Sequence, residues 1–527
     1  MDTITTCQNL GELLAAAADH HGDRPFLIFE GAYLSFAEAD RRADRLAAAL
    51  QQAGIRKGDR VGVMLPNGFD FPLAWLAIAR CGAVIVPVNI TYQPHDLHYI
   101  LDDSGATVLL IHADYLPVLE QVRRALIELM EVIVFGGVAA GHRTLEAALT
   151  TAPTSPTPVA TSPDDLLNIQ YTSGTTGFPK GCMLTHGYWL LLGALASAYL
   201  QVTPDDVDLT AQPYYYMDPQ WNTVVALMGG IPLVILPRFS PSRFWLAVRE
   251  HGVTFFYMLG TMPFYLLKQP EDPSLEQGHK LRLVICSGIH PEFHAAFEAR
   301  WKVPWREAFG MTETGVDLLA PVEDGSTVGS GALGRPVATK TVQVVDATDR
   351  CVTGGEIGEL VVRGQPMMLG YWNNPEATAA TIREGWLHTG DLAYRHPQTG
   401  YFHLVGRLKD MVRRSGENIA ASEVEGVLAQ HPAVKLAAVV PVPDALRGEE
   451  VKAYIVLQPG YTCDTTPPQE LVDFVRARLA YFKAPRYIAY TDDLPRTPSE
   501  RIAKHMLIKA AADLSRDSYD AVDGVWR

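Results

Sequence analysis

The sequence predicts an α/β protein with a large N-terminal domain of helix-covered parallel sheets plus a small barrel-like lobe, and a small mobile α+β domain at its C-terminal end. Up to about residue 335, short apolar runs alternate with helical patterns, which is typical of parallel strands covered by helices. From residue 337 to 363 the strands become short and are separated by glycine turns. At 527 residues the chain is also too long for one ordinary hydrophobic core.

The first strands are expected at five short apolar runs, residues 26–29, 60–65, 84–88, 107–112 and 132–135. After the first of them, Ser35 and Glu38 form a capping box, which predicts a helix that ends near Gly54. Residues 151–163 are rich in Thr, Pro and Ser and predict a surface crossing. A strand at 166–171 and a helix at 185–200 follow.

The same alternation continues through residues 224–236, 255–258 and 283–286. Turns at Gly354, Gly355 and Gly358 then mark the short strands of the barrel-like lobe. The final segment has a capping box from Ser422 to Glu425, strands at 434–442 and 451–457, and a helix at 469–479. These elements predict a compact α+β domain of ordinary size.

Composition excludes several classes of protein. A net charge of −15 argues against nucleic acid as a partner, because binding it requires a basic face. The six cysteines lie far apart without metal-site spacing, which fits a reducing cytoplasm. We see no signal peptide, and the apolar stretches 189–200 and 224–236 are too short to cross a bilayer. We therefore expect a cytoplasmic protein with no membrane span, and a homodimer is the default expectation.

A glycine- and hydroxyl-rich loop occupies residues 171–181 (YTSGTTGFPKG). We expect it in a strand-to-helix turn, where backbone N–H groups, hydroxyls and the Lys180 ammonium face a phosphate. It is not a Walker loop, because Pro179 and Gly181 flank the lysine. The alternative is a mobile surface loop. The candidate phosphate-binding residues are Thr172, Ser173, Gly174, Thr175, Thr176 and Gly177.

A second motif, FGMTETG, covers residues 309–315. The Glu313 carboxylate can hold Mg²⁺ on a triphosphate, Thr312 can bond the α-phosphate, and Phe309 offers a face to adenine. Gly310 and Met311 complete the candidate nucleotide-binding turn. The alternative is an ordinary helix cap formed by a threonine with a nearby glutamate.

Together with WLHTGD at 386–391 and VGRLKD at 405–410, these motifs resemble the adenylate-forming superfamily of acyl-CoA synthetases, luciferases and peptide-synthetase adenylation domains. The resemblance spans essentially the whole chain. It implies that Asp391 and Arg407 contact ribose and that Lys409 is the hinge between an N-terminal domain, 1–408, and a C-terminal lid, 409–527. It also implies that Gly288, Ile289 and His290 border the adenine.

The resemblance further implies an acyl site and a coenzyme A tunnel. Tyr216 stands where relatives carry a histidine that gates the substrate carboxylate, although Tyr214–Tyr216 could simply pack in the core. The surroundings of Asp218 are most similar to crotonobetaine/carnitine-CoA ligases. The segment with Arg414, Gly416 and Glu417 resembles the strand that lines the pantetheine tunnel. Candidate cations for coenzyme A phosphates, or alternatively solvated surface charges, are Arg413, Arg414 and Arg447.

The chain departs from the superfamily at Arg501, where relatives have the lysine that bridges the substrate carboxylate and the α-phosphate. A planar guanidinium does not reproduce the contact of a compact ammonium, and losing one positioned charge costs about 10²–10³ in rate. Three alternatives stay open: adenylation is impaired, Arg501 suffices, or Lys504 substitutes from the same helical face.

The resulting hypothesis is an acid–thiol ligase that forms an acyl-CoA thioester through acyl-AMP, with impaired adenylation. It would use a carboxylic acid with ATP, or acyl-AMP from a separate adenylating enzyme, together with Mg²⁺ and coenzyme A. The alternatives are a complete synthetase, an amino-acid-activating domain, or a non-catalytic binder of nucleotide or acyl-adenylate. The intact Lys180, Glu313, Asp391 and Gly416 disfavour the binder.

Overall fold

The computed structural model describes residues 6–138, 141–172, 179–259, 262–415, 417–496 and 502–527. These residues form two compact units. The first unit holds Pro179–Thr341, Val362–Gly385 and the described part of Met1–Thr172. The second holds Val342–Val361 and the described part of Trp386–Arg527. The fold is mixed α/β, as the sequence predicts, with a large N-terminal part that contains parallel sheets and a separate C-terminal part.

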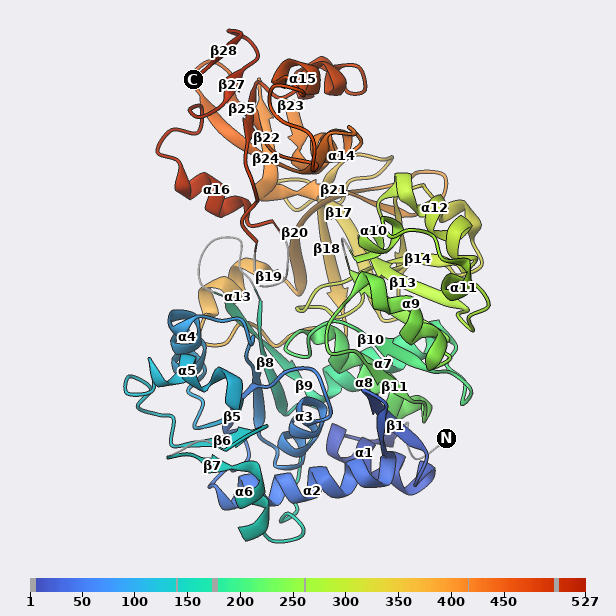
Figure 1. Ribbon diagram of the computed structural model, residues 1–527, viewed down its shortest axis with the longest axis vertical. Helices are drawn as coiled ribbons and strands as arrows, with labels where there is room; N and C mark the ends of the chain where they lie inside the picture. The colour runs from blue at the N-terminus through green and yellow to red at the C-terminus, as the bar shows by residue number, and fades with distance from the viewer. Residues whose placement is uncertain (1–5, 139–140, 173–178, 260–261, 416, 497–501) are drawn as a thin grey trace. The chain divides into compact units, whose positions relative to one another are not determined.

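One sheet of the first unit has seven strands in the order β7-β6-β5-β3-β4-β8-β9. Strands β5 to β9 of this sheet are labelled in Figure 1. Neighbouring strands run parallel except β8 and β9, which are antiparallel. Their apolar side chains are buried, as expected for a sheet covered on its faces. The bounds are β3 (Arg60–Met64), β4 (Val84–Pro87), β5 (Val108–His112), β6 (Glu131–Phe135), β7 (Arg143–Thr144), β8 (Leu166–Thr172) and β9 (Lys180–Thr185).

A second sheet path in this unit runs β16-β15-β14-β13-β12-β10-β11-β1-β2. Its central strands are parallel and both ends are antiparallel. An aromatic core that includes Phe244, Trp301 and Trp305 packs on it. The bounds are β1 (Pro25–Phe29), β2 (Ala32–Ser35), β10 (Asp208–Thr210), β11 (Leu233–Ile235), β12 (Phe255–Leu259), β13 (Leu283–Ser287), β14 (Trp305–Phe309), β15 (Leu318–Leu319) and β16 (Ala332–Pro336).

The helices of the first unit begin where the sequence places capping residues. Ser35 accepts the N–H of Glu38 at 3.2 Å, and Thr185 accepts that of Tyr188 at 3.1 Å. The helices are α1 (Leu10–His21), α2 (Phe36–Gln52), α3 (Asp70–Arg80), α4 (Pro94–Ser104), α5 (Leu116–Glu120), α6 (Leu145–Thr151), α7 (His186–Leu200), α8 (Met217–Gly229), α9 (Pro241–Glu250), α10 (Met262–Leu267), α11 (Pro273–Glu276), α12 (Pro291–Trp301) and α13 (Pro375–Thr381).

The segment after the phosphate motif differs from the prediction. Instead of a strand-to-helix turn, β8 is followed by a second strand, β9, which pairs Thr172 with Lys180 and Tyr171 with Gly181. Helix α7 begins only at His186. The close approach of the two strands explains the glycine, because a Cβ at Gly181 would meet Ile169 Cγ2 at 2.5 Å. The expectation that a helix N-terminus supports the phosphate motif was therefore wrong.

The second unit contains the sheet β23-β22-β25-β26-β27-β28, with β24 paired to β25. Its helix α14 has Ala420 as its N-cap, and the predicted capping box at Ser422 was wrong, because that hydroxyl donates to the carbonyl of Val405 at 2.9 Å. The elements are β22 (Met411–Arg414), β23 (Glu417–Ala420), α14 (Ala421–Ala429), β24 (Val434–Asp444), β25 (Gly448–Leu457), α15 (Pro468–Arg476), β26 (Tyr487–Tyr490), α16 (Lys504–Ala510), β27 (Tyr519–Asp520) and β28 (Val525–Trp526).

Five further strands precede this sheet in the chain, and one of them, β19 (Ile382–Arg383), lies in the first unit. Residues of β17 (Lys340–Val345) and β18 (Gly358–Gly364) belong to both units, whereas β20 (Trp386–Arg395) and β21 (Phe402–Arg407) lie in the second. Strands β20 and β21 pair antiparallel and place Asp391 opposite Arg407. Within the described residues, no helix is long and apolar enough to cross a membrane.

A buried histidine at the start of α7 predicts a pH-dependent stability. His186 is fully buried, its Nδ1 accepts the N–H of Leu10 at 3.3 Å, and burial lowers its pKa to about 4. In the unfolded chain the imidazole binds a proton near pH 6.5, whereas in the folded protein it does so only near pH 4. The free energy of unfolding is therefore unaffected by this group above about pH 6.5, and it falls by up to about 3 kcal/mol on acidification towards pH 4.

His186→Asn keeps an acceptor but cannot titrate in this range. We therefore expect the melting temperature of the wild type to fall further than that of the variant between about pH 7 and about pH 4.5. Equal decreases in both proteins would contradict the assignment. Scanning calorimetry across this range is the measurement.

Candidate active site

Lys180, within the glycine- and hydroxyl-rich loop 171–181, is the first residue of β9. Its Nζ lies 4.7 Å from the centroid of the Tyr371 ring. The hydroxyl of Tyr371 in turn donates to Glu313 Oε1 at 2.8 Å. Burial first, and then the Glu313 carboxylate, raise the pKa of this phenol, so it stays protonated and remains a donor. A cation and a carboxylate thus lie on either side of one tyrosine.

The FGMTETG motif forms a tight turn after β14. The amides of Thr314 and Gly315 donate to the carbonyl of Met311 at 3.1 and 2.7 Å. Only glycine fits at Gly310, because a Cβ there would lie 1.9 Å from the carbonyl oxygen of Gly315. The turn carries Thr312, whose carbonyl accepts the hydroxyl of Tyr188 at 2.9 Å.

Glu313 is held from two directions in this turn. Only 7% of the residue is exposed, and its carbonyl accepts the N–H of Met368 at 2.7 Å while its carboxylate accepts Tyr371. Two contacts to one segment, residues 368–371, therefore fix both the backbone and the side chain. Such a fixed carboxylate is suited to hold a charge in a defined place.

A buried ion pair braces the same turn. Lys340 Nζ lies 3.4 Å from Asp317 Oδ1, and both side chains are fully buried. The ammonium also donates to the carbonyls of Thr314 at 2.9 Å and Gly364 at 3.3 Å, and to that of Pro366. Burial lowers the pKa of Lys340 and raises that of Asp317, while the opposite charge of each partner counteracts both shifts.

The residues expected at the adenine, Gly288 to His290, directly follow strand β13. Strands β13 and β14 are parallel and adjacent, so Gly288 and Ile289 lie at the same sheet edge as Phe309. The buried Glu307 carboxylate accepts the N–H groups of Gly288 and Ile289, both at 2.7 Å. Burial raises the pKa of Glu307 to about 8, although both N–H donors act in the opposite direction. His290 is the N-cap residue of α12.

Asp391 and Arg407 are brought together in the second unit, as an opposed pair on β20 and β21. The Arg407 Nε lies 2.6 Å from Asp391 Oδ1. The N–H of Asp391 donates to the Thr389 hydroxyl at 3.0 Å. The sequence predicts that both contact ribose, and this pairing gives a carboxylate oriented by a guanidinium.

Arg414 is already engaged inside the second unit. Its Nε lies 2.6 Å from Glu450 Oε2, and another nitrogen donates to the carbonyl of Phe482 at 2.6 Å. Arg413, by contrast, is exposed. Among the two neighbouring arginines, Arg413 is therefore the better placed to meet a soluble phosphate.

Tyr216 is the N-cap residue of α8, and its ring contacts that of Tyr215 at 4.7 Å between centroids. The proposed gate tyrosine thus lies in a turn between β10 and α8. Other predicted site residues lie outside the described residues, namely Ser173, Gly174, Thr175, Thr176, Gly177, Gly416 and Arg501. Only the backbone is described for Lys409 and Glu417.

Sequence reasoning missed Tyr371, Glu307 and the Lys340–Asp317 pair. Tyr371 lies 58 residues beyond Glu313, and no periodicity links the two. Glu307 offered one signal, a carboxylate inside the otherwise apolar strand β14, because a charged group there needs a partner. Within the described residues, no three His, Cys, Asp or Glu side chains gather as a metal site.

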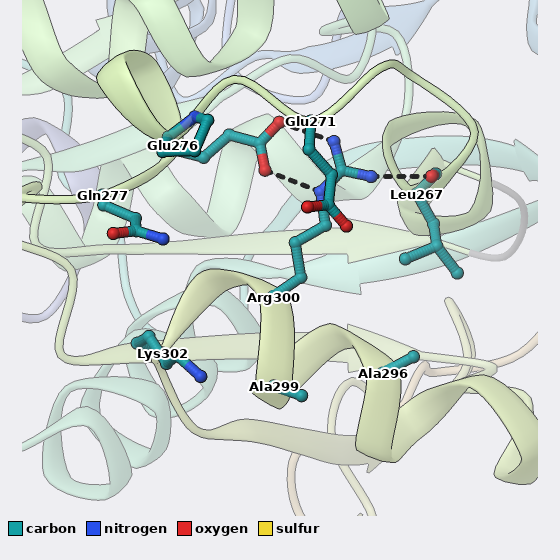
Figure 2. A pocket seen from close by; sticks show the side chains of 9 residues that line it. Leu267, Glu271, Glu276, Gln277, Ala296, Ala299, Arg300 and Lys302 are labelled. Atoms are coloured by element: carbon teal, nitrogen blue, oxygen red, sulfur yellow. Dashed lines mark hydrogen bonds and ion pairs between the residues drawn. The ribbon is translucent and has the colours of Figure 1, made fainter.

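A hollow of about 400 Å³ lies in the first unit and is lined by an ion pair (Figure 2). It lies between α11 and α12, where Arg300 and Glu276 form an ion pair at 2.6 Å. The same guanidinium donates to the carbonyls of Leu267, Gln269 and Pro270. Most donors of this guanidinium are therefore used within the protein.

Comparison with known proteins agrees with these motifs. The sequence model of the AMP-binding enzyme family matches residues 14–372, and that of the AMP-binding enzyme C-terminal domain matches 423–501. A crotonobetaine/carnitine-CoA ligase of Salmonella paratyphi A is 32% identical over 518 residues, which cover 95% of this chain and 99% of the relative.

Solved structures of ligases share the fold. ATP-bound MatB from Rhodopseudomonas palustris has a TM-score of 0.87 at 28% identity, covering 96% of this chain and 100% of its own. The anthranilate CoA ligase AuaEII, in complex with anthranoyl-AMP, has a TM-score of 0.87 at 26% identity, covering 95% and 97%. The o-succinylbenzoate CoA synthetase from Bacillus subtilis, with OSB-AMP, has a TM-score of 0.85 at 27% identity, covering 96% and 99%. The chain belongs to the AMP-binding, adenylate-forming enzyme family, in the branch of the acyl-CoA ligases.

Proposed function

We propose that this ligase forms acyl-CoA thioesters from acyl-adenylates and that its own adenylation step is impaired. The observation that carries the proposal is the combination of Arg501 at the position of the adenylating lysine with a Lys504 that is already paired. The ligase would then depend on acyl-AMP from a separate adenylating enzyme.

Lys504 is poorly placed to substitute for the missing lysine. Its Nζ lies 2.7 Å from Glu425 Oε1 and 3.7 Å from Asp410 Oδ2, and only 16% of the side chain is exposed. To reach a substrate, the ammonium would have to leave two carboxylates, which costs electrostatic free energy. This supports impaired adenylation over rescue by Lys504.

The groups for binding a nucleotide are nevertheless retained. Mg²⁺ is usually held by one or two protein carboxylates together with substrate phosphates, and Glu313 fits this role. Its carboxylate is separated by a single phenol from the Lys180 ammonium, the cation that we assign to the phosphates. Mg²⁺ would neutralise phosphate charge, while Thr312 and the phosphate motif orient the nucleotide.

The retained half-reaction has simple requirements. The coenzyme A thiolate attacks the acyl carbon of acyl-AMP, a C–S bond forms, the bond to the phosphate oxygen breaks, and AMP leaves with the electron pair. This step needs a positioned adenylate and access for the thiol, to which we assign Gly416 in the tunnel. It does not need the charge at position 501 that aligns attack on phosphorus.

The acyl side suggests which acids to test first. Asp218 is only 8% exposed at the start of α8. Burial is the main cause that raises the pKa of Tyr257, and the charge of Asp218 raises it further. The Tyr257 ring contacts that of Trp221 at 5.5 Å. A carboxylate beside aromatic rings favours an acid with a quaternary ammonium, as in the carnitine and crotonobetaine named for the relatives.

Two assays on purified protein test the proposal. One is ATP–pyrophosphate exchange with carnitine, crotonobetaine, benzoate and anthranilate, and the other is thioester formation from the chemically made acyl-AMP of each acid. We expect thioester formation with at least one acyl-AMP and exchange about 10²–10³-fold slower than in Arg501→Lys.

Lys504→Met tests the alternative in which Lys504 substitutes for the adenylating lysine, because it removes that ammonium without changing residue 501. We expect it to leave thioester formation from acyl-AMP unchanged within about threefold. Rapid exchange by the wild type would identify a complete synthetase and overturn impaired adenylation. If none of the acyl-AMPs gives a thioester, the assignment as a ligase for these acids is overturned.

A further inference from the structure

A buried network of three side-chain amides connects the phosphate-motif strand with the turn that carries Tyr216. Asn168 and Gln170 lie on β8, and Gln220 lies on α8. At most 2% of any of the three residues is exposed. Buried amides are costly unless they are satisfied, so their partners indicate what the network is for.

Two indoles determine the orientation of the first amide. Trp75 Nε1 and Trp189 Nε1 both donate to Asn168 Oδ1 at 3.0 Å. An indole N–H can only donate, so the acceptor end of Asn168 must face the tryptophans. Asn168 Nδ2 consequently donates in the opposite direction, to Gln220 Oε1 at 2.7 Å.

The donor end of Gln220 therefore faces the turn before α8. Gln220 Nε2 donates to the carbonyls of Tyr214 and Tyr216, both at 3.0 Å. Gln170 Nε2 donates to the carbonyl between them, that of Tyr215, at 2.6 Å. Three consecutive carbonyls are thus held by two amides whose orientations are set from the core.

We propose that Gln220 and Gln170 are positioning residues for the acyl gate, fixing the backbone of residues 214–216 relative to β8. This inference rests on the gate role assigned to Tyr216. Asn168 and Gln170 both lie on β8, so the network ties the backbone of residues 214–216 to this strand. Loss of the amides loosens the acyl site and leaves the nucleotide contacts in place.

The test compares two amides on the same helix. Gln220→Met removes the donors to the carbonyls of Tyr214 and Tyr216, while Asn222→Leu removes an equally buried amide that donates to Asp208 Oδ2 at 2.8 Å and does not contact the gate. Both variants lose a buried hydrogen bond, so an effect of general destabilisation appears in both. Gln170→Met, which spares Gln220, is the milder variant should Gln220→Met fail to fold.

The first readout does not depend on activity. We expect faster amide hydrogen exchange in peptides covering residues 212–218 of Gln220→Met than in the wild type or in Asn222→Leu. The second readout is calorimetric binding of AMP and of crotonobetainyl-AMP and benzoyl-AMP without coenzyme A. We expect the Kd of the acyl-adenylate to rise about tenfold in Gln220→Met, and that of AMP to change less than about threefold.

Equal amide hydrogen exchange of residues 212–218 in Gln220→Met and Asn222→Leu would overturn the inference. An equal rise in the Kd of AMP and of acyl-AMP in Gln220→Met would overturn it as well. If the wild type binds no acyl-adenylate, the proposed function fails, and the exchange comparison still decides whether the amides hold residues 214–216. Slower or unchanged exchange in both Gln220→Met and Gln170→Met would likewise refute the network's role.

Discussion

Replacing Glu313 by glutamine is expected to lower adenylation by about 10²–10³-fold, because it removes the charge that we propose holds Mg²⁺ on the phosphates. The glutamine side chain has the same shape as glutamate and can still accept a hydrogen bond from the Tyr371 hydroxyl. The substitution therefore tests the negative charge of Glu313 alone. The experiment is best made in the Arg501→Lys background, where pyrophosphate exchange is expected to be measurable. We also expect the Mg²⁺ concentration for half-maximal exchange to rise.

Tyr371→Phe and Glu376→Gln are the controls for this prediction. Tyr371→Phe removes only the hydrogen bond that orients Glu313, and we expect a loss of about tenfold. Glu376 is exposed in the first turn of α13, and its substitution should have no effect on exchange. A Glu313→Gln enzyme with normal exchange and normal Mg²⁺ dependence would show that the metal is held elsewhere.

Replacing Asp317 by asparagine is expected to destabilise the first unit by about 3–5 kcal/mol, because it leaves the Lys340 ammonium buried without its counter-charge. The three carbonyl acceptors keep the ammonium solvated in part but do not neutralise it. Urea unfolding followed by tryptophan fluorescence measures the change.

A double variant distinguishes the loss of the Lys340–Asp317 pair from the cost of leaving one buried charge unpaired. In Lys340→Met with Asp317→Asn, no unpaired charge remains, and we expect part of the lost stability to return. The surface comparison is Glu38→Gln, which breaks the exposed pairs with Arg41 and Arg42 and should cost less than about 1 kcal/mol. If Asp317→Asn costs no more than Glu38→Gln, the buried pair does not brace the Glu313 turn.

Many strands, two helix starts and the motif order were predictable because each depends on neighbouring residues. Apolar runs predicted strands such as β5 and β6, and Ser35 and Thr185 were correctly placed at helix starts. Local patterns failed at Lys180, where a loop leading into a helix was expected and β9 forms, and at Ser422, where a capping box was expected and Ala420 is the N-cap. The pairing of Gly181 with Tyr171 depends on a close approach between two strands that local periodicity does not record.

The sequence by itself determined the family, because the motifs that bind nucleotide are short contiguous runs whose chemistry is visible in their residue types. It also carries the proposal that Arg501 replaces the adenylating lysine, because that proposal depends on residue identity alone. Only the tertiary structure decided that Glu313 is oriented by Tyr371, that Glu307 accepts the N–H groups of Gly288 and Ile289, and that Lys504 is paired with Glu425. These partners are distant in the chain, and burial and register, which arise only on folding, bring them together.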